Sequence, residues 1–462
     1  MIALRPYQEK LVTDTRANFL AGLARQLLVL PTGGGKTVCF SFMAGAARAK
    51  GLTVWILAHR VELLEQISST LRAFGISHGV IAPGYLGARR EQVQVASVFT
   101  LARRLDHYAK PDLIIVDEAH HAIGKSTWGA VIKANPQAKL LGVTATPIRL
   151  AGEGLDDLFD VMVQGPTVRN LIDLGALSPY RLFAPKGVDL SSVHSRMGDF
   201  VRGELATAMN KPSITGDAVG HYKKLAMGKR AVAFCVSVEH AESVAEQFKA
   251  AGIPAASIDG SMDKVLRKSV LASFSAGEIR VLTSCDLISE GFDVPAIEVA
   301  ILLRPTQSLG LYLQQVGRAL RVFPGKAEAL ILDHAGNVNR HGLPDDDRDW
   351  TLEGREKKRG SKPSAVPVKS CPNCFATVAS IATHCRCGHA FASAPREVEQ
   401  VAGELQEVDP DVQRREQRVQ QGRAQSETDL VALGRSRGMK RPELWARHVL
   451  RARKAKQMGM LG

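Results

Sequence analysis

The sequence predicts an α/β fold made of two tandem domains, each built around a parallel β-sheet. Short, continuously apolar runs alternate with segments of helical periodicity over the first 336 residues, and strands that helices bury on both faces have this composition. The alternating pattern occurs twice, and a chain of 462 residues is longer than one ordinary domain. We therefore expect one domain at 1–150, a linker at 151–175 and a second domain at 176–336.

The apolar runs that we interpret as strands are short and evenly distributed. In the first domain they lie at 27–30, 53–58, 92–98, 112–118 and 139–146. In the second domain they lie at 231–237, 256–259, 279–284, 298–303 and 329–334. Segments of helical periodicity lie between them, and this order predicts helices on both faces of each sheet.

The composition changes after residue 336. Segment 344–369 is charged and poor in large apolar residues, which predicts a flexible linker. A compact cysteine cluster follows at 370–392. Residues 396–462 are polar with helical periodicity, and cations are concentrated at 435–456, so we expect a basic helical tail.

The bulk composition excludes several classes of protein. No run approaches the roughly 20 apolar residues that span a membrane, and the first ten residues contain no apolar stretch typical of a secretory signal. We therefore expect a soluble protein of the cytoplasm with no membrane partner. The formal net charge of +14 favours a polyanionic partner such as nucleic acid.

A glycine-rich loop between a strand and a helix predicts a phosphate-binding site. Its glycines let backbone N–H groups approach phosphate oxygens, and the following helix presents its positive end. We expect Lys36 to bridge the β- and γ-phosphates of ATP and the Thr37 hydroxyl to bind Mg²⁺. The loop as a whole supplies Thr32, Gly33, Gly34, Gly35, Lys36 and Thr37.

Two further sets of charged residues complete a catalytic constellation. Asp117 and Glu118 end an apolar strand, so we assign Asp117 to Mg²⁺ and Glu118 to the attacking water. Arg318 and Arg321 share one helix face. We interpret them as arginine fingers that reach ATP from the second domain, although a basic helix surface is the simpler alternative. His121, beside the DEAH sequence at 117–120, is interpreted as incidental.

This ordered set of motifs resembles superfamily 2 helicases of the DEAD/DEAH type over the first 336 residues or so. The motifs are an adenine-recognising RPYQ sequence at 5–8, motif Ia at 58–60, Ib at 96–101, TATP at 144–147, IV at 234–240, V at 283–295 and VI at 314–321. The closest resemblance is to bacterial RadD-like DNA helicases and to type III restriction-type helicase subunits. It implies two RecA-like domains that move along DNA, with RNA less favoured.

The resemblance also implies contacts that the spacing alone does not. It places Arg5, Gln8, Gly291 and Asp293 at ATP, and it places Arg60, Ser97 and Thr283 at the nucleic-acid backbone. The implied cofactors of the motor are ATP and Mg²⁺.

The cysteine cluster predicts a small zinc ribbon-like module. Thiolates at paired spacing can complete a tetrahedral Zn²⁺ site, and the candidate ligands are Cys371, Cys374, Cys385 and Cys387. The second pair departs from the usual two-residue spacing. His384 in place of Cys385 would restore that spacing, and the absence of any metal is the remaining alternative.

Three functions are compatible with these residues. The favoured one is an ATP-dependent DNA helicase or translocase of DNA repair or recombination, acting as a monomer. The second is the motor subunit of a restriction or anti-phage system, with a nuclease supplied by a partner protein. The third is an ATP-gated platform that binds DNA and recruits repair proteins but unwinds little. The basic tail either clamps the phosphate backbone, forms a solvated surface helix or docks on the motor.

Overall fold

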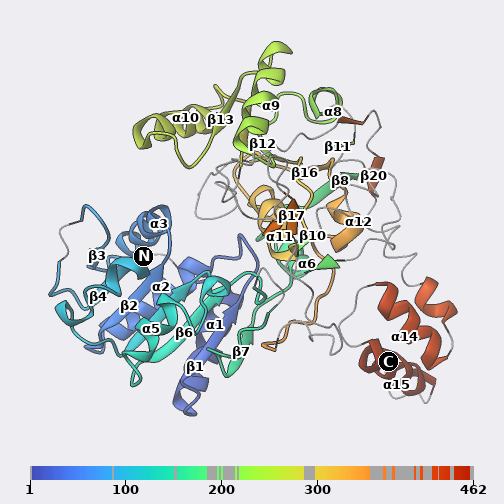
Figure 1. Cartoon of the computed structure of the whole chain (residues 1–462). Coiled ribbons are helices and arrows are strands. Elements are labelled where there is room, and N and C mark those ends of the chain that lie inside the picture. Colours follow the sequence, from blue (N-terminus) through green and yellow to red (C-terminus); the bar gives the residue numbers. More distant parts are fainter. Residues whose placement is uncertain are drawn as a thin grey trace.

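The computed structural model describes residues 3–85, 88–149, 153–184, 218–285, 297–353, 419–424, 426–437 and 442–457, together with the backbone of seven short strands between 195 and 408. Two seven-stranded sheets dominate the fold, and each has helices on both faces (Figure 1). The predicted pair of α/β domains is therefore confirmed.

The sheet of the first domain is parallel throughout, in the order β3-β4-β2-β5-β6-β1-β7. Leu28 and Leu27 of β1 are fully buried against opposite faces of this sheet, which explains why the strand is continuously apolar. The strands are β1 (Arg25–Val29), β2 (Val54–Ala58), β3 (Gly79–Ile81), β4 (Val93–Ser97), β5 (Leu113–Asp117), β6 (Lys139–Thr144) and β7 (Val161–Gln164). The helices are α1 (Pro6–Leu20), α2 (Lys36–Arg48), α3 (Val61–Ala73), α4 (Val98–Leu101), α5 (Thr127–Lys133) and the 3-10 turns η1 (Leu105–His107) and η2 (Ala119–His121).

The sheet of the second domain has the order β13-β14-β12-β15-β16-β8-β20. Its first six strands are parallel, while β20 is antiparallel to β8. The strands are β8 (Tyr180–Ala184), β12 (Ala231–Phe234), β13 (Ala255–Ile258), β14 (Val281–Ser284), β15 (Val299–Leu302), β16 (Ala329–Asp333) and β20 (Gln406–Val408). The helices are α6 (Val168–Asp173), α8 (Ala218–Ala226), α9 (Val238–Ala250), α10 (Lys264–Ala276), α11 (Leu309–Ala319) and α12 (Asn337–His341).

The segment at 151–175 is more structured than the linker that we expected. Leu155, Leu158 and Phe159 are buried in the core of the first domain, and β7 then pairs with β1 at the sheet edge. Leu171 of α6 is buried in the core of the second domain. The connection between the domains thus contributes buried residues to the cores of both.

Residues 344–353, which we name the strap, also differ from the predicted flexible linker. Asp345 is buried in the second domain, where it pairs with Arg169 and accepts a hydrogen bond from the Tyr180 hydroxyl. Trp350 and Leu352 pack against the core of the first domain. The strap therefore leaves the second domain and returns to the first.

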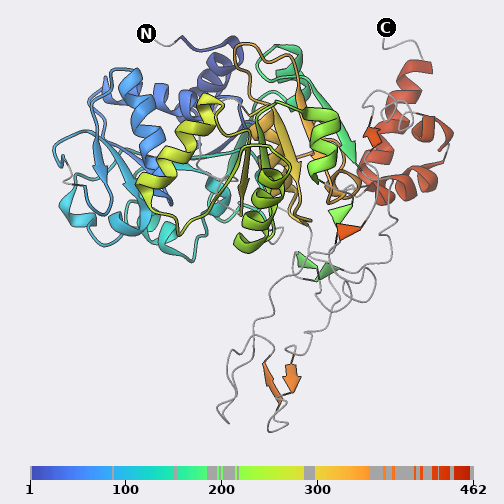
Figure 2. The same cartoon turned by 90° about the horizontal axis from the view of Figure 1, so that it is seen from above.

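The described residues of the tail include a strand as well as helices. The strand β20 lies within the segment predicted as a helical tail, and it covers the edge of the second sheet, which removes an exposed strand edge. The helices α14 (Glu427–Ser436) and α15 (Pro442–Gln457) pack on each other, with Leu430 and Ala446 buried between them. Figure 2 shows this helical pair at the side of the second domain.

Further short strands occur in two-stranded pairs. These are β9 (Ser195–Arg196) with β10 (Asp199–Phe200), β11 (Ile214–Thr215) with β19 (Gln400–Val401), and β17 (Val368–Ser370) with β18 (Thr377–Ala379). The predicted zinc ligands Cys371, Cys374, Cys385 and Cys387, and the alternative His384, lie outside the described residues. Among the helices that are described, none is long and apolar enough to cross a membrane.

Candidate active site

The glycine-rich loop joins β1 to α2 in a conformation that only glycine adopts easily. Gly33 and Gly35 have φ values of 85° and 89°, in the left-handed region. A Cβ atom on Gly35 would lie 2.3 Å from Nε2 of Gln8, and one on Gly33 would lie 2.7 Å from Cδ2 of Leu177. Lys36 is the first residue of α2, so the positive end of that helix lies at the loop.

Side chains at the start of α1 form hydrogen bonds with the same loop. The Tyr7 hydroxyl and the Gln8 side-chain amide both donate to the Gly34 carbonyl, at 2.9 and 3.2 Å. Gln8 in turn accepts a hydrogen bond from the Arg5 backbone N–H at 2.9 Å. The RPYQ sequence and the phosphate loop are therefore one hydrogen-bonded unit.

The two acidic residues lie at the carboxyl end of β5. Asp117 is buried, and one of its oxygens accepts a hydrogen bond from the Glu118 backbone N–H at 3.0 Å. Glu118 has a φ of 47°, and among the described residues it alone has a positive φ without being glycine. Such a backbone conformation costs energy and persists where the surroundings impose it.

The charges of this region perturb one another. Burial lowers the pKa of the Lys36 amine, which Glu118 and Asp117 partly offset. Burial and the neighbouring Glu118 raise the pKa of the Asp117 carboxyl. A phosphate beside Lys36 and a divalent cation beside Asp117 would reverse both shifts. The carboxylate of Asp117 and the hydroxyl of Thr37 are also oxygen donors of the kind that Mg²⁺ prefers, so these residues fit the ion.

Helix α11 of the second domain packs directly on this loop. A Cβ atom on Gly317 would lie 2.7 Å from Cβ of Thr32, which leaves no room for a larger residue. Arg318 is buried, and its charge and that of Arg321 lower the pKa of Lys36 further. The sequence-predicted arginines are thus brought to the phosphate loop from the other domain.

A second contact joins α11 to the acidic motif. The Gln314 side-chain amide lies 3.4 Å from Nε2 of His120. On its other side, His120 Nδ1 lies 3.0 Å from the Thr144 hydroxyl and 3.4 Å from a Glu118 oxygen. This histidine therefore touches three of the predicted motifs.

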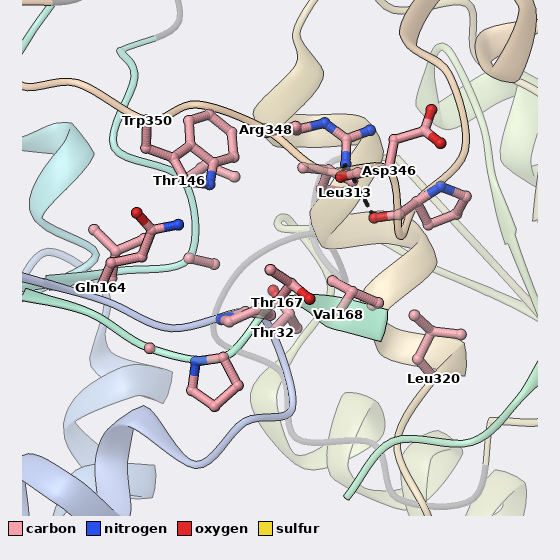
Figure 3. Close-up of a pocket in the computed structure, with 17 residues that line it drawn as sticks. Thr32, Thr146, Gln164, Thr167, Val168, Leu313, Leu320, Asp346, Arg348 and Trp350 are labelled. Atoms are coloured by element: carbon pink, nitrogen blue, oxygen red, sulfur yellow. Dashed lines mark hydrogen bonds between the residues drawn. The ribbon is translucent and has the colours of Figure 1, made fainter. Parts of the chain in front are cut away.

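A pocket lies at the domain boundary beside the phosphate loop (Figure 3). Thr32 and Thr146 of the first domain face Leu313 of α11, while Trp350 and Arg348 of the strap lie along the same boundary. The Arg348 guanidinium donates to four backbone carbonyls, those of His341, Leu343, Pro344 and Asp346. The strap is thereby fixed in shape where it passes the site.

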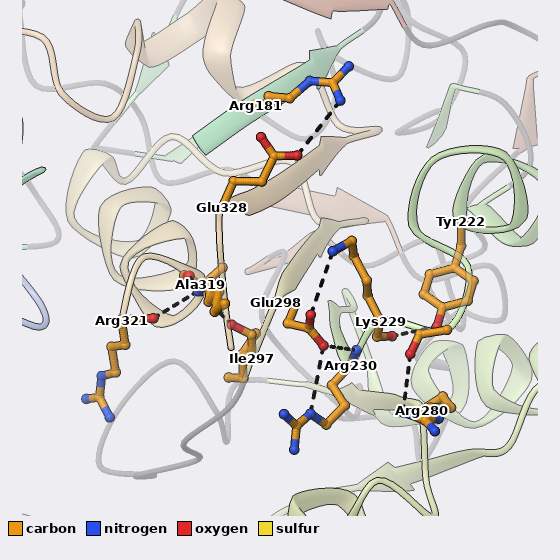
Figure 4. A network of polar contacts seen from close by, with 12 residues as sticks. Arg181, Tyr222, Lys229, Arg230, Arg280, Ile297, Glu298, Ala319, Arg321 and Glu328 are labelled. Atoms are coloured by element: carbon orange, nitrogen blue, oxygen red, sulfur yellow. Dashed lines mark hydrogen bonds and ion pairs between the residues drawn. The ribbon is translucent and has the colours of Figure 1, made fainter. Parts of the chain in front are cut away.

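Lys326 fixes the end of α11. Its amine donates to the carbonyls of Ile297 and Arg321, at 3.0 and 2.9 Å, and also to that of Ala319. Figure 4 shows Ala319 and Arg321 at this helix end, with the Arg321 side chain pointing away from the cluster. A cation at a helix C-terminus satisfies carbonyls that lack helical partners.

The three residues predicted to contact nucleic acid do not lie in similar surroundings. Arg60 follows β2, and Ser97 ends the neighbouring strand β4, where it pairs with Ala58; both therefore lie at the carboxyl edge of the sheet. Thr283 is fully buried in β14, and its hydroxyl donates to the Ala241 carbonyl at 2.6 Å. This burial does not favour the contact predicted for Thr283. Gly291 and Asp293 lie outside the described residues.

Two contacts of this region are not predicted from the sequence. His59 and His121 contact each other through their rings, and Glu62 pairs with Arg267 across the domain boundary. Neither contact has a signal in the sequence, because the partners are distant along the chain.

Comparison with known proteins agrees with this geometry. Residues 1–149 match the family model "Type III restriction enzyme, res subunit", and residues 210–323 match the model "Helicase conserved C-terminal domain". The chain is 38% identical over 366 residues to a 51.5 kDa protein of Lactococcus phage (isolate 7-9), covering 78% of this chain and 77% of that protein. The chain belongs to the superfamily 2 helicases. Members of this family are hydrolases that act on ATP.

This helicase also has relatives in Saccharomyces cerevisiae and Rattus norvegicus. It is 31% identical to the IRC3 protein of Saccharomyces cerevisiae, covering 72% of this chain and 51% of that protein. It is 26% identical to the ATP-dependent DNA helicase Q1 of Rattus norvegicus, covering 69% of this chain and 51% of that protein. The helicase thus spans about half the length of these two relatives.

Solved structures share the fold of this helicase. A fragment assigned to the HsdR subunit of a type I restriction enzyme from Vibrio vulnificus YJ016 superposes with a TM-score of 0.58 at 23% identity, covering 75% of this chain and 67% of that one. The type ISP restriction-modification enzyme LlaBIII bound to DNA superposes with a TM-score of 0.52 at 19% identity, covering 72% of this chain and 28% of that one.

Proposed function

We propose that this helicase hydrolyses ATP between its two domains and uses the cycle to move along DNA in repair or recombination. The observation that carries the proposal is the convergence of opposite charges from both domains. Lys36 and the Asp117–Glu118 pair come from the first domain, while Arg318 and Arg321 of the second follow Gly317, which packs against Thr32 of the phosphate loop. Hydrolysis would then require that the domains be closed.

The side chains have distinct proposed roles in this reaction. Lys36 and the loop N–H groups bind the β- and γ-phosphates, and Asp117 with Thr37 would hold Mg²⁺, which neutralises phosphate charge. Glu118 orients a water molecule whose oxygen bonds to the γ-phosphorus while the bond to the β–γ bridging oxygen breaks. Glu118 accepts the proton of that water. Arg318 and Arg321 stabilise the charge that develops on the transferred group.

We propose DNA as the nucleic acid along which the helicase moves. The chain has a formal net charge of +14, and the ends of β2 and β4, where Arg60 and Ser97 lie, are side by side at one sheet edge. Contacts with the phosphate backbone from these strand ends would give little sequence specificity. The RPYQ and TATP sequences resemble DNA translocases, and one relative is named as a DNA helicase, which supports DNA over RNA.

A role in restriction or phage defence is the second candidate. It is favoured by the match of 1–149 to a type III restriction subunit and by the likeness to a phage protein. In that case a nuclease partner would be required, because we find no nuclease motif in the sequence. Recovery of a nuclease with the purified chain would favour defence, whereas recovery of repair proteins would favour repair.

ATP hydrolysis with different nucleic acids tests the proposal. Wild-type protein would be assayed with no nucleic acid, single-stranded DNA, duplex DNA, forked DNA and RNA. We expect DNA to stimulate turnover most. Lys36→Ala should abolish that turnover, and Glu118→Gln should lower it on the order of a hundredfold or more while ATP still binds.

The matched control is Lys249→Ala, which removes an exposed lysine of α9. It should leave turnover unchanged. Near wild-type turnover of either active-site variant would contradict the assigned roles. Stimulation by RNA alone would contradict the choice of DNA.

A further inference from the structure

Three histidine rings form a continuous row in the first domain. The ring centroids of His59 and His121 are 4.5 Å apart, and those of His121 and His120 are 4.2 Å apart. Both ring pairs are tilted, at 52° and 41°. His121 is thus in contact with a ring on either side of it.

The two ends of the row lie at functionally different places. His59 is the residue after β2 and precedes Arg60, a predicted contact with the nucleic-acid backbone. His120 lies 3.4 Å from the Glu118 carboxylate and 3.4 Å from the Gln314 amide of the second domain. The row therefore spans from the proposed DNA loop to the proposed catalytic carboxylate.

The backbone between the acidic motif and the row is suited to transmit a displacement. Glu118 has the left-handed conformation described above, and Ala119, His120 and His121 form the 3-10 turn η2 immediately after it. A strained residue keeps its conformation only while its surroundings hold it. Because His121 is the last residue of this turn, a shift of the His59 ring would reach Glu118 through a few rigid bonds.

We propose that His121 is a positioning residue that couples DNA binding at the loop after β2 to the placement of Glu118. This inference rests on the proposed function, since it requires that DNA stimulate hydrolysis. His121 touches neither ATP nor DNA in this proposal. It acts by ring contact with His59 and His120, so the residue that we first interpreted as incidental determines how strongly hydrolysis depends on DNA.

The test is the ratio of turnover with DNA to turnover without it. His121→Asn keeps a polar side chain in the turn but removes the ring, and we expect it to lower the ratio by about fivefold or more, the lower end of ordinary coupling between two sites. Basal turnover, KM for ATP and DNA affinity should stay within about twofold of wild type, because no ligand contact is lost. His78→Asn is the matched control; His78 lies before the edge strand β3, where its ring contacts the Ile76 carbonyl, and its removal should not change the ratio.

A second variant separates coupling from local packing. His59→Asn breaks the row at its other contact, and the double variant should lower the ratio no more than either single variant, because one break already interrupts the row. A double variant whose ratio falls by the product of the two single effects would overturn the proposal. So would an unchanged ratio in His121→Asn, or a fall in basal and stimulated turnover by the same factor. A wild-type protein that DNA does not stimulate would instead contradict the proposed function, and the coupling with it.

Discussion

Arg267 of α10 and Glu62 of α3 form an ion pair across the domain boundary, with 3.0 Å between Nη2 and Oε1. The arginine side chain is 9% exposed and the glutamate 28% exposed, so solvent screens this pair less than an ordinary surface pair. Glu62 lies in the first turn of the helix that follows Arg60. The pair therefore ties the proposed DNA loop to the second domain, where α10 lies over α3 (Figure 2).

Loss of this ion pair should weaken domain closure. Glu62→Gln is expected to raise KM for ATP about fivefold, which corresponds to about 1 kcal/mol for a partly shielded pair. Steady-state kinetics measure the change, and a charge swap of Glu62→Arg with Arg267→Glu should restore part of it. Glu246→Gln, which breaks an exposed pair within α9, is the control. An unchanged KM in Glu62→Gln would show that the pair does not contribute to closure.

Removal of the buried arginine of α11 should affect hydrolysis and not DNA binding. Arg318→Ala is expected to lower kcat on the order of a thousandfold, because a finger supplied by a second domain stabilises the transferred phosphoryl group. Arg318→Lys should rescue little, since an ammonium lacks the planar fork of donors. Arg72→Ala, on the exposed face of α3, serves as the control for loss of one cation. A large loss of DNA affinity in Arg318→Ala would mean that this residue contacts DNA instead of ATP.

Lys326 lies at the end of α11 and not among the proposed ATP contacts, but its loss should lower kcat. Lys326→Met removes the donors to the carbonyls at the end of α11, so we expect a roughly tenfold lower kcat through loosened placement of the two arginines. Burial lowers the pKa of Lys326 to about 8. Above that pH the neutral amine has fewer N–H donors, so wild-type turnover should fall more steeply between pH 8 and 9 than turnover of Lys326→Arg. Identical pH profiles would contradict this role.

Local patterns in the sequence predict the phosphate loop, the acidic pair and the arginines. Each of these depends on a few adjacent residues at the end of a strand or on one helix face, and the sheet then brings the strand ends together. The contact of Thr283 with nucleic acid is instead implied by the family resemblance. Its burial does not favour that contact, because the Thr283 hydroxyl donates to a backbone carbonyl in α9.

Contacts between distant residues could not be predicted. Glu62 and Arg267 are 205 positions apart, and nothing in either helix specifies the other as a partner. The strap is charged and has few large apolar residues, which is the composition of a linker. Two of its residues, Trp350 and Leu352, nevertheless find apolar surface on the first domain, and a pattern search does not weigh such isolated residues.

The cysteine cluster stays a prediction that metal analysis can test. We expect one Zn²⁺ per chain, with a chelator removing it and Cys371→Ser preventing its binding. Cys385→Ser and His384→Ala decide the third ligand, because the variant that loses zinc identifies it. Cys39→Ser is the control, since Cys39 is a buried free thiol in the first domain. Absence of zinc from freshly purified wild-type protein would contradict the module.

The strap should limit how far the two domains separate. Asp345 anchors one end in the second domain through Arg169 and Tyr180, and Leu352 accepts hydrogen bonds from the backbone N–H groups of Leu155 and Asp156 in the first. Trp350 packs between these anchors and lines the pocket beside the phosphate loop. Because the anchors lie on different domains, separation of the domains must stretch or release this segment.

Trp350→Ala should therefore favour the open arrangement. Loss of this partly buried aromatic side chain removes about 1–3 kcal/mol of apolar contact, enough for a severalfold higher KM for ATP and faster protease cleavage within 344–353. Saturating ATP should slow that cleavage again, because ligand that binds the closed arrangement opposes opening. Trp445→Ala in the helical pair is the matched control and should change neither quantity. Equal cleavage of wild type and Trp350→Ala, with and without ATP, would mean that the strap follows the domains without restraining them.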